Sequence, residues 1–293
     1  MSSVASLRQI RRRIRSVENT KKITRAMEMV AAAKLRRFQD FLESSRPYTE
    51  KLAQLVGELL GEAPADYQHP FLTERKGKEK KTALVVFTSD TGLCGTYNSE
   101  LEGTAQGWLK AHSERKVSVV FVGKHGAHSF HRRHYETLGS FFDLRVSRVD
   151  EILGRLEKTL QAAFSEGRVD EIQAVYTQME SLARFQPTVE KLLPLTPAPS
   201  SEERGRMEFL IEPDAGTVLN RLLPVFFDAR LRFIFYHALL TEQIARMNAM
   251  RQATKNAKDM IDELTLLRNK ARQASITKEI IEIVSGSRTL KLK

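Results

Sequence analysis

The sequence is poor in several features that characterise common protein classes. Cys94 is its one cysteine, so the chain cannot form an internal disulfide, which fits a reducing compartment. The longest apolar runs, at 83–87 and 117–123, have the length of a strand and fall far short of the roughly 20 residues that cross a bilayer. The start of the chain is arginine-rich but lacks the apolar centre of a secretory signal. Its apolar spacing leads directly into a helical pattern, so we expect mature structure without a membrane span.

Motifs of nucleotide and metal chemistry are also missing. The segment "SDTGLCGTYN" (89–98) follows a strand pattern and precedes a helix pattern, but it lacks the phosphate-loop spacing and lysine. It is typical of a strand-to-helix turn that Gly92 and Gly95 make possible, with Cys94 as a packing residue rather than a reactive thiol. Nucleotide binding remains the less favoured interpretation of this turn.

Four histidines recur every three residues, at His125, His128, His131 and His134. Neighbours in this series would share a helix face, so metal binding is conceivable, but no cysteine or carboxylate completes a ligand set. Two arginines between them would repel a cation. Nothing in the sequence places a nucleophile beside a base. We therefore expect no catalytic residue, metal or cofactor in this chain.

What the chain does have is positive charge. There are 47 lysine and arginine residues against 36 aspartate and glutamate residues, a net charge of +11. The partner is then expected to be acidic: nucleic acid, an anionic membrane surface or an acidic protein. The basic run at 8–16 could bind a phosphate backbone, but it lacks the interleaved aromatic residues of a nucleic-acid reader. A basic nucleic-acid-binding protein remains an alternative.

The chain falls into three zones, which we predict as domains at 1–60, 81–195 and 214–293. The first has a helical pattern with apolar steps of three and four, and Pro47 predicts a bend or break in it. The predicted seam, which changes phase twice, consists of Leu7, Ile10, Ile14, Val17, Ile23, Met27, Val30, Leu35, Phe38 and Leu42.

The middle zone alternates strand and helix patterns, which predicts a mostly parallel sheet with helices outside it. Strands are expected at 81–90, where the strand closes in a turn, at 116–123 and at 171–178, and an edge strand or an extended exit from the sheet is expected at 187–197. Helices are expected at 96–114, 125–136 and 149–167, the last capped by Asp150 and ended by Gly167.

The third zone is helical without proline or glycine from Ala229 to Ser285. Its predicted heptad seam consists of Met260, Leu264, Leu267, Ala271 and Ala274, and upstream the seam continues through Ile244, Met247, Ala253 and Ala257. At 1.5 Å per residue the two terminal helices would reach about 80 Å and about 100 Å, too long for a small α/β domain. We therefore predict an α/β fold plus a long antiparallel coiled coil of the N- and C-terminal helices, with a Rossmann-like α/β domain inserted between them.

Several segments carry a resemblance to a known family. "NTKKITRAMEMVAAAKLRR", "SRPY", "SDTGLCGTYN", "FLIEPD", "TEQIARMNAMRQATKNA" and "NKARQASITKEIIEIVSG" are collinear with the gamma subunit of F-type ATP synthase, and the resemblance extends over nearly the whole chain. It implies a non-catalytic rotor shaft that transmits torque between the membrane c ring and a hexamer of alpha and beta subunits. The implied partners are alpha, beta, epsilon and the c ring, with catalysis on beta.

The resemblance also implies contact residues. Met27 is similar to the shaft residue near the acidic loop of beta, and Arg246 to its neighbour across the coil. The upper-shaft contacts implied by the motif "ARQASITKE" are Gln273, Thr277 and Glu279. The base contacts implied by "FLIEPD" are Phe209, Ile211 and Glu212.

This sequence departs from the family at Thr91, where the glycine turn usually has arginine, and at Ser287, which replaces a usual alanine. The paired regulatory cysteines of the chloroplast form are absent. The resemblance therefore favours a bacterial subunit, peripheral to the cytoplasmic face of the cell membrane.

Overall fold

The computed structural model describes residues 7–64, 66–75, 80–131, 135–181, 184–196 and 211–290. It consists of two compact units. Met1–Ala31 and Met247–Lys293 form the paired-helix unit, and Ala32–Arg246 form the sheet unit. No helix of the described residues is long and apolar enough to cross a membrane. The elements in chain order are α1 (Leu7–Glu62), β1 (Lys81–Phe87), α2 (Tyr97–Ala111), β2 (Lys116–Val122), α3 (Lys124–Phe130), β3 (Glu136–Phe141), α4 (Val149–Ser165), β4 (Glu171–Ser181), β5 (Arg184–Leu193) and α5 (Ala215–Leu290).

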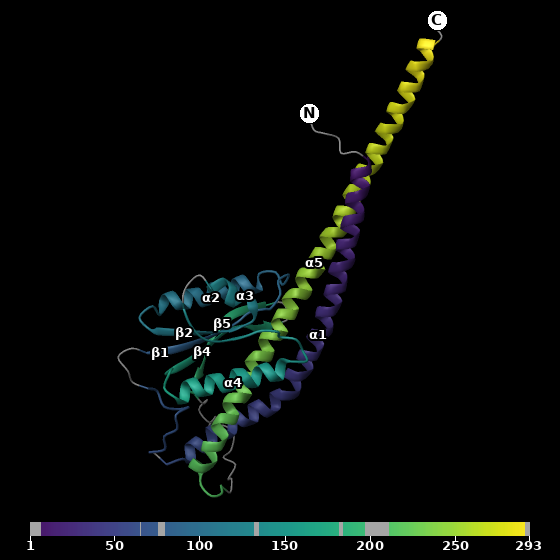
Figure 1. Ribbon diagram of the computed structural model, residues 1–293. Coiled ribbons are helices and arrows are strands. Elements are labelled where there is room, and N and C mark those ends of the chain that lie inside the picture. The colour runs from purple at the N-terminus through teal and green to yellow at the C-terminus, as the bar shows by residue number, and fades with distance from the viewer. Residues whose placement is uncertain are drawn as a thin grey trace. The chain divides into compact units, whose positions relative to one another are not determined.

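The sheet unit is built on five strands in the order β3-β2-β1-β4-β5. The pairs β1–β2, β1–β4 and β2–β3 are parallel, and β5 joins β4 antiparallel at one edge. Pro187 lies on this edge strand, where a missing N–H can be tolerated. Helices α2 and α3 lie on one face of the sheet and α4 on the other (Figure 1). The predicted mostly parallel sheet with outer helices is confirmed.

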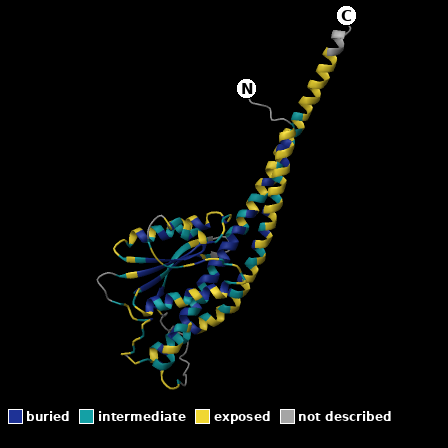
Figure 2. Ribbon diagram, viewed as in Figure 1, coloured by how far each residue is buried: buried dark blue, intermediate teal, exposed yellow. Residues whose placement is uncertain are grey.

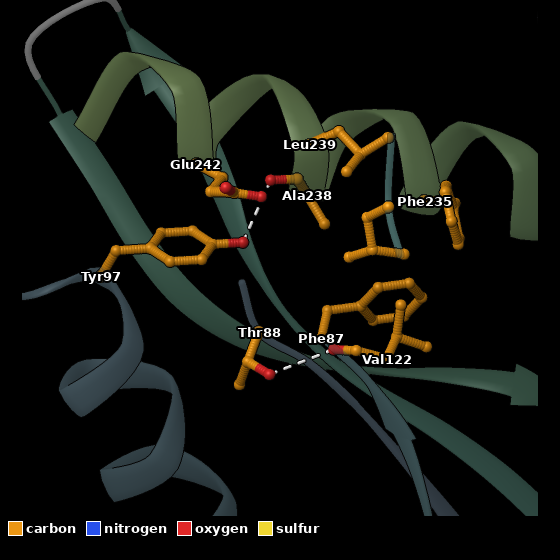
Figure 3. A pocket seen from close by; sticks show the side chains of 9 residues that line it. Phe87, Thr88, Tyr97, Val122, Phe235, Ala238, Leu239 and Glu242 are labelled. Atoms are coloured by element: carbon orange, nitrogen blue, oxygen red, sulfur yellow. Dashed lines mark hydrogen bonds between the residues drawn. The ribbon is translucent and has the colours of Figure 1, made fainter. Parts of the chain in front are cut away.

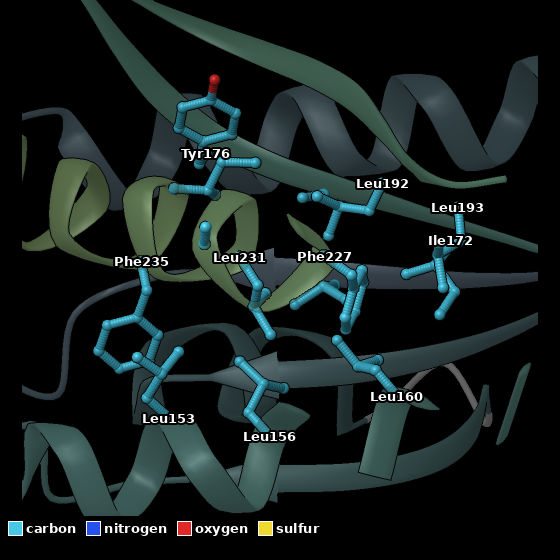
Figure 4. Packing of buried hydrophobic residues seen from close by; sticks show 14 of the residues in the cluster. Leu153, Leu156, Leu160, Ile172, Tyr176, Leu192, Leu193, Phe227, Leu231 and Phe235 are labelled. Atoms are coloured by element: carbon cyan, nitrogen blue, oxygen red, sulfur yellow. The ribbon is translucent and has the colours of Figure 1, made fainter. Parts of the chain in front are cut away.

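Two apolar cores fill the space on the two faces of the sheet. The smaller core joins α2 and α3 to Leu84, Val86 and Val119. The larger one joins α4 to the parts of α1 and α5 that belong to the sheet unit. Figure 4 shows leucines of α4 meeting Phe227, Leu231 and Phe235 of α5 beside the strands β4 and β5. The central strands are buried on both faces, which explains their unbroken apolar sequences.

In the paired-helix unit the start of α1 lies antiparallel to the later part of α5. Ile10 and Ile14 pack against Leu264, and farther along α1 the Thr24 side chain meets Thr254. Residues 272–285 of α5 are exposed, as Figure 2 shows by their yellow colour. The contact between the two helices is therefore narrow and limited to one side of each.

Several sequence predictions were wrong in detail. The helix expected at 125–136 ends at Phe130, and Glu136 begins the unpredicted edge strand β3. This strand is short, contains Gly139 and has three exposed residues among its six, so its sequence has no strand periodicity. Asp150 is not the cap of α4; Arg148 holds that position, and Asp150 lies in the first turn.

Of the bend or break predicted at Pro47, the break was wrong, because α1 is helical on both sides of that residue. The hydroxyl groups of Ser44 and Ser45 bond to the carbonyl groups of Phe41 and Leu42, three residues back on the same helix. Gly167, with φ of 73°, does end α4 as expected.

The predicted seams need a correction in both helices. Ile23 and Val30 are 60% and 56% exposed, and Met260 and Leu267 are 44% and 48% exposed. The buried side of α1 instead follows an unbroken heptad with no change of phase. Its members, buried or half-buried, are Ile10, Ile14, Val17, Lys21, Thr24, Glu28, Ala31, Leu35, Phe38 and Leu42. The corresponding positions of α5 are Met250, Thr254, Ala257, Ile261, Leu264, Arg268 and Ala271.

The physical reason for this difference is that the seam includes polar residues. Thr24 and Glu28 are both buried although neither is apolar. A search restricted to apolar residues had to change phase to avoid them, and it selected exposed neighbours instead.

Candidate functional site

The glycine turn between β1 and α2 is a compact polar structure. The backbone N–H of Ser89 donates to the Asn98 side chain over 3.0 Å, and the Asn98 amide donates to Ser89 Oγ over 2.8 Å. Leu93 and Gly95 have φ values of 64° and 62°, so the chain reverses through the left-handed region. These bonds join the two ends of the turn and fix its shape.

Cys94 is buried inside this turn. Its Sγ lies 3.3 Å from the Asn98 amide nitrogen and 3.7 Å from Ser89 Oγ. Burial raises the pKa of the thiol above its usual value, although the hydrogen bond with Ser89 and the nearby Arg246 charge oppose this. A raised pKa disfavours the thiolate, which is the reactive form. This agrees with the packing role that the sequence suggested for Cys94.

Arg246 of α5 reaches the same turn. Its Nη2 donates to the Thr91 carbonyl oxygen over 2.8 Å and to Thr91 Oγ1 over 3.0 Å. Its Nη1 pairs with the Glu242 carboxylate one helical turn away. Both side chains of this ion pair are less than a tenth exposed. Sequence reasoning missed this cluster, because Thr91 and Arg246 are more than 150 residues apart along the chain.

Beyond the carboxyl ends of β1 and β2 the space is filled by α5. In doubly wound sheets nucleotides bind at this edge. Here Phe235, Leu239 and Glu242 of α5 occupy it, and the remaining cavity is about 10 Å³, about the space of one water molecule (Figure 3). The Tyr97 hydroxyl donates to the Ala238 carbonyl across it over 3.0 Å. Among the described residues that line this cavity, α5 therefore takes the place that a nucleotide would need.

The histidine series has no metal-binding arrangement among the described residues. His125 is half-buried, whereas His128 and His131 are exposed and line a surface hollow with Lys124 and Phe142. His134 lies outside the described residues. In the part of the chain that the structure describes, no group of three or more histidine, cysteine or acidic side chains could hold a metal ion.

The paired-helix unit contains a polar layer in its seam. Thr254 Oγ1 lies 2.8 Å from Thr24 Oγ1, and Glu28 accepts from Arg251 over 3.2 Å and from Arg25 over 2.9 Å. Burial alone would raise the pKa of Glu28, but hydrogen bonds from the two arginines outweigh it and the pKa is lowered. Glu28 therefore stays ionised and joins the two helices electrostatically.

Next to this layer lies the surface that the sequence predicted for Met27. Met27 itself is half-buried. A groove beside it is lined by three basic side chains, one acidic side chain and four polar or apolar ones: Lys21, Lys22, Arg25, Glu18, Ala26, Met29, Thr254 and Ile261. Leu7–Ala31 contains eight lysines and arginines but two glutamates, so this surface is positive. Met27 and Arg246 lie in different units, so their predicted proximity stays a prediction.

The other predicted contact residues are mostly accessible. Gln273, Thr277 and Glu279 are exposed on α5, where the Thr277 hydroxyl bonds to the Gln273 carbonyl and Glu279 accepts from Ser275. Ile211 is half-buried against the larger core and Glu212 is exposed. Phe209 lies outside the described residues.

Comparison with known proteins identifies the family. The ATP synthase family matches residues 6–290. ATP synthase gamma chains of Stenotrophomonas maltophilia and Syntrophobacter fumaroxidans are 38% and 40% identical, over 97% and 98% of this chain and 99% and 100% of theirs.

Solved structures show the same fold. A rotor chain of Euglena gracilis mitochondrial ATP synthase has a TM-score of 0.60 at 14% identity, with 92% of this chain and 98% of that chain covered. A Tetrahymena thermophila chain from a central stalk and c-ring structure has a TM-score of 0.56 at 22% identity, with 79% and 99% covered. Identity at the level of the bacterial relatives over nearly the whole of both chains establishes homology. This chain belongs to the family of ATP synthase gamma chains.

Proposed function

We propose that this chain is the central rotor shaft of the F1 sector of a proton-translocating ATP synthase. The observation that carries the proposal is the 38–40% identity to ATP synthase gamma chains over nearly the full length of both partners. The chain itself is a non-catalytic subunit. The filled strand edge and the carbonyl-lined turn agree with nucleotide chemistry on a partner, which is the beta subunit in this proposal.

The proposed architecture is an antiparallel coiled coil of the terminal helices with an inserted Rossmann-like domain. The heptad of buried positions on each helix supports the coiled coil, and the parallel order of β3, β2, β1 and β4 supports the Rossmann-like description. We propose functional segments at 1–60, 81–195 and 214–293, with the two terminal segments forming the shaft.

The mechanism follows from differential contact. Proton flow turns the c ring, the base of the shaft turns with it, and the coiled coil rotates inside the alpha/beta hexamer. The shaft can shift the conformation of a beta subunit only through contacts that differ between its orientations. Coupling is reciprocal, so ATP hydrolysis drives the shaft in the opposite direction. The complex would place the chain at the cytoplasmic face of the bacterial cell membrane.

The proposed contact residues differ in accessibility: Gln273, Thr277, Glu279 and Glu212 are exposed, Met27 and Ile211 are half-buried, and Arg246 is buried. Met27 and the positive groove beside it face acidic loops of beta. Exposed ion pairs contribute about 0–1 kcal/mol each, so they attract the loops but are weak enough to break as the shaft turns. Gln273, Thr277 and Glu279 contact the upper part of the hexamer, together with Arg246. Phe209, Ile211 and Glu212 contact the c ring or epsilon at the base.

Co-purification from the native cell tests the proposal directly. The tagged full-length chain is expected to bring alpha, beta and epsilon with it, identified by mass spectrometry. The purified chain alone is expected to hydrolyse no ATP. Recovery of nucleic acid without these subunits, with binding that weakens steeply with salt, would favour the nucleic-acid-binding alternative. ATP turnover that depends on residues 89–98 would overturn the non-catalytic assignment.

Met27→Lys tests the contact surface. An added ammonium group beside the groove should bind acidic loops too tightly and impair coupling more than assembly. The measurement is proton pumping and ATP hydrolysis in the reconstituted complex, with Lys255→Met as the control on an exposed position of α5. Equal pumping per ATP in Met27→Lys and wild type would remove Met27 from the contact surface.

A further inference from the structure

The side of the glycine turn that faces α5 presents hydrogen-bond acceptors, whereas a phosphate loop needs hydrogen-bond donors. A phosphate loop presents backbone N–H groups to an anion. This turn instead directs the carbonyl oxygens of Thr91 and Gly92 toward the Arg246 guanidinium, at 2.8 Å and 3.4 Å. Carbonyl oxygens are acceptors, so this surface of the turn is built to bind a cationic donor from α5.

Arg246 uses its two terminal nitrogens for different partners. Nη1 holds the Glu242 carboxylate and Nη2 holds the turn, so one planar guanidinium joins a buried carboxylate to two backbone carbonyls. Burial raises the pKa of Glu242, and the Arg246 charge opposes that rise. Gln243 also donates to the Glu242 carboxylate, but its side chain is neutral, so Arg246 supplies the charge of this hydrogen-bonded pair.

The turn covers the one thiol of the chain. Cys94 is 2% exposed, and it is enclosed by Ser89, Asn98 and the Thr91 carbonyl. The same Thr91 carbonyl that accepts from Arg246 also accepts from Ser89 Oγ, over 2.8 Å. The Thr91 carbonyl oxygen therefore takes part both in the contact with Arg246 and in the hydrogen bonds that enclose Cys94.

We propose that Arg246 is an internal latch, which fastens the glycine turn to α5 and keeps it closed over Cys94, so that breaking the latch opens the turn while the sheet unit stays folded. The inference does not depend on the rotor function. It gives the departure at Thr91 a physical role, because the Thr91 hydroxyl supplies a third acceptor to the same Arg246 nitrogen at 3.0 Å. A partner carboxylate that takes Arg246 would have to compete with this set of acceptors.

Thiol labelling of the full-length chain tests the latch, since Cys94 is its one cysteine. The rate of reaction with dithionitrobenzoate reports how often the turn opens, because a buried thiol reacts only in the open form. Arg246→Met should raise this rate about tenfold or more. Arg246→Lys keeps the charge but cannot bridge both partners, so it should raise the rate as well. Thr91→Val removes one acceptor and should raise the rate about twofold.

Two controls separate the latch from a general loss of stability. Lys255→Met removes an exposed cation of the same helix and should leave the labelling rate unchanged. Urea unfolding of each variant gives the share of any rise that comes from global unfolding. Hydrogen exchange should increase at 89–98 and stay constant in β1 and β4.

The outcomes that overturn the latch are equally definite. Labelling rates of Arg246→Met and Arg246→Lys within the range of wild type would exclude it. A rise that the fall in global stability fully explains, with exchange increased throughout the sheet, would reduce Arg246 to an ordinary stabilising residue. If Arg246→Met does not fold, the labelling rates of Arg246→Lys and Thr91→Val test the proposal instead.

Discussion

The sheet unit and the paired-helix unit bury different kinds of side chain. The sheet unit encloses leucine and phenylalanine side chains of three helices and both faces of a sheet, with residues such as Leu156 and Phe227 fully buried. In the paired-helix unit, Ile10, Ile14 and Leu264 form a small apolar cluster, and the seam continues through threonine and glutamate. The first composition gives stability by apolar burial. The second leaves apolar and basic side chains outside for a partner.

Two buried glutamates sharpen this difference. Glu28 and Glu242 are each 6% exposed, yet the pKa of Glu28 is lowered and that of Glu242 is raised. Burial pushes both pKa values upward. In Glu28 the hydrogen bonds from Arg251 and Arg25 outweigh burial. In Glu242 the charges of Arg246 and Lys34 oppose the effect of burial without outweighing it, and the negative charge of Asp90 raises the pKa further. The surroundings of Glu28 thus favour the ionised carboxylate, whereas those of Glu242 disfavour it.

The largest expected effect is a cavity in the sheet unit. Phe227→Ala removes a fully buried ring that packs 5.7 Å from the ring of Phe71, and it should lower the free energy of unfolding by about 3–5 kcal/mol. Urea unfolding followed by the fluorescence of Trp108, the one tryptophan, measures this unit.

The matched control is Phe142→Ala, the same change at a ring that is exposed in the same unit. It should cost less than about 1 kcal/mol. Equal costs for the two variants would contradict the assignment of Phe227 to the core.

A smaller effect is expected from acid, with opposite signs in the two units. Because the folded pKa of Glu28 is lowered, its stabilisation is present above the unfolded pKa of about 4.3 and is lost as the pH falls through the folded pKa. The raised pKa of Glu242 means that this group favours the folded state most below the unfolded pKa, and the benefit is lost as the pH rises through the folded pKa.

Glu28→Gln should therefore lower stability at neutral pH and reduce its loss on acidification. Glu242→Gln should reduce the loss of stability that occurs as the pH rises through the folded pKa of Glu242. Thermal unfolding at a series of pH values, followed by circular dichroism and by Trp108 fluorescence, separates the two. Parallel pH profiles for both variants would show that the two carboxylates are not in opposite environments.

The smallest effect on the free chain is expected at the exposed end of α5. Ile281 is 59% exposed, so Ile281→Ala should change the free energy of unfolding by less than about 0.5 kcal/mol. In the assembled complex the same side chain would be covered in the proposed function, and there the variant should weaken association with the hexamer. A loss of stability in the free chain as large as that of Phe227→Ala would place Ile281 in a core instead.

Sequence reasoning succeeded where one local pattern is repeated. The strands predicted within 81–90 and 116–123 are present as β1 and β2, because each is a continuous apolar run buried on both faces. It failed at β3, because the apolar residues of this partly exposed edge strand, which contains Gly139, do not alternate with polar ones. It failed again at the seam, because the polar Thr24 and Glu28 occupy positions that an apolar pattern skips.

By itself the sequence determined the long terminal helices, the alternation of strands and helices, and the excess of positive charge. Each of these follows from neighbours within a few turns of chain, which the sequence displays directly. Only the tertiary structure decided that Arg246 meets Thr91 and that Arg251 meets Glu28. Those contacts join residues more than 150 positions apart, and their energy depends on burial that exists once the chain has folded.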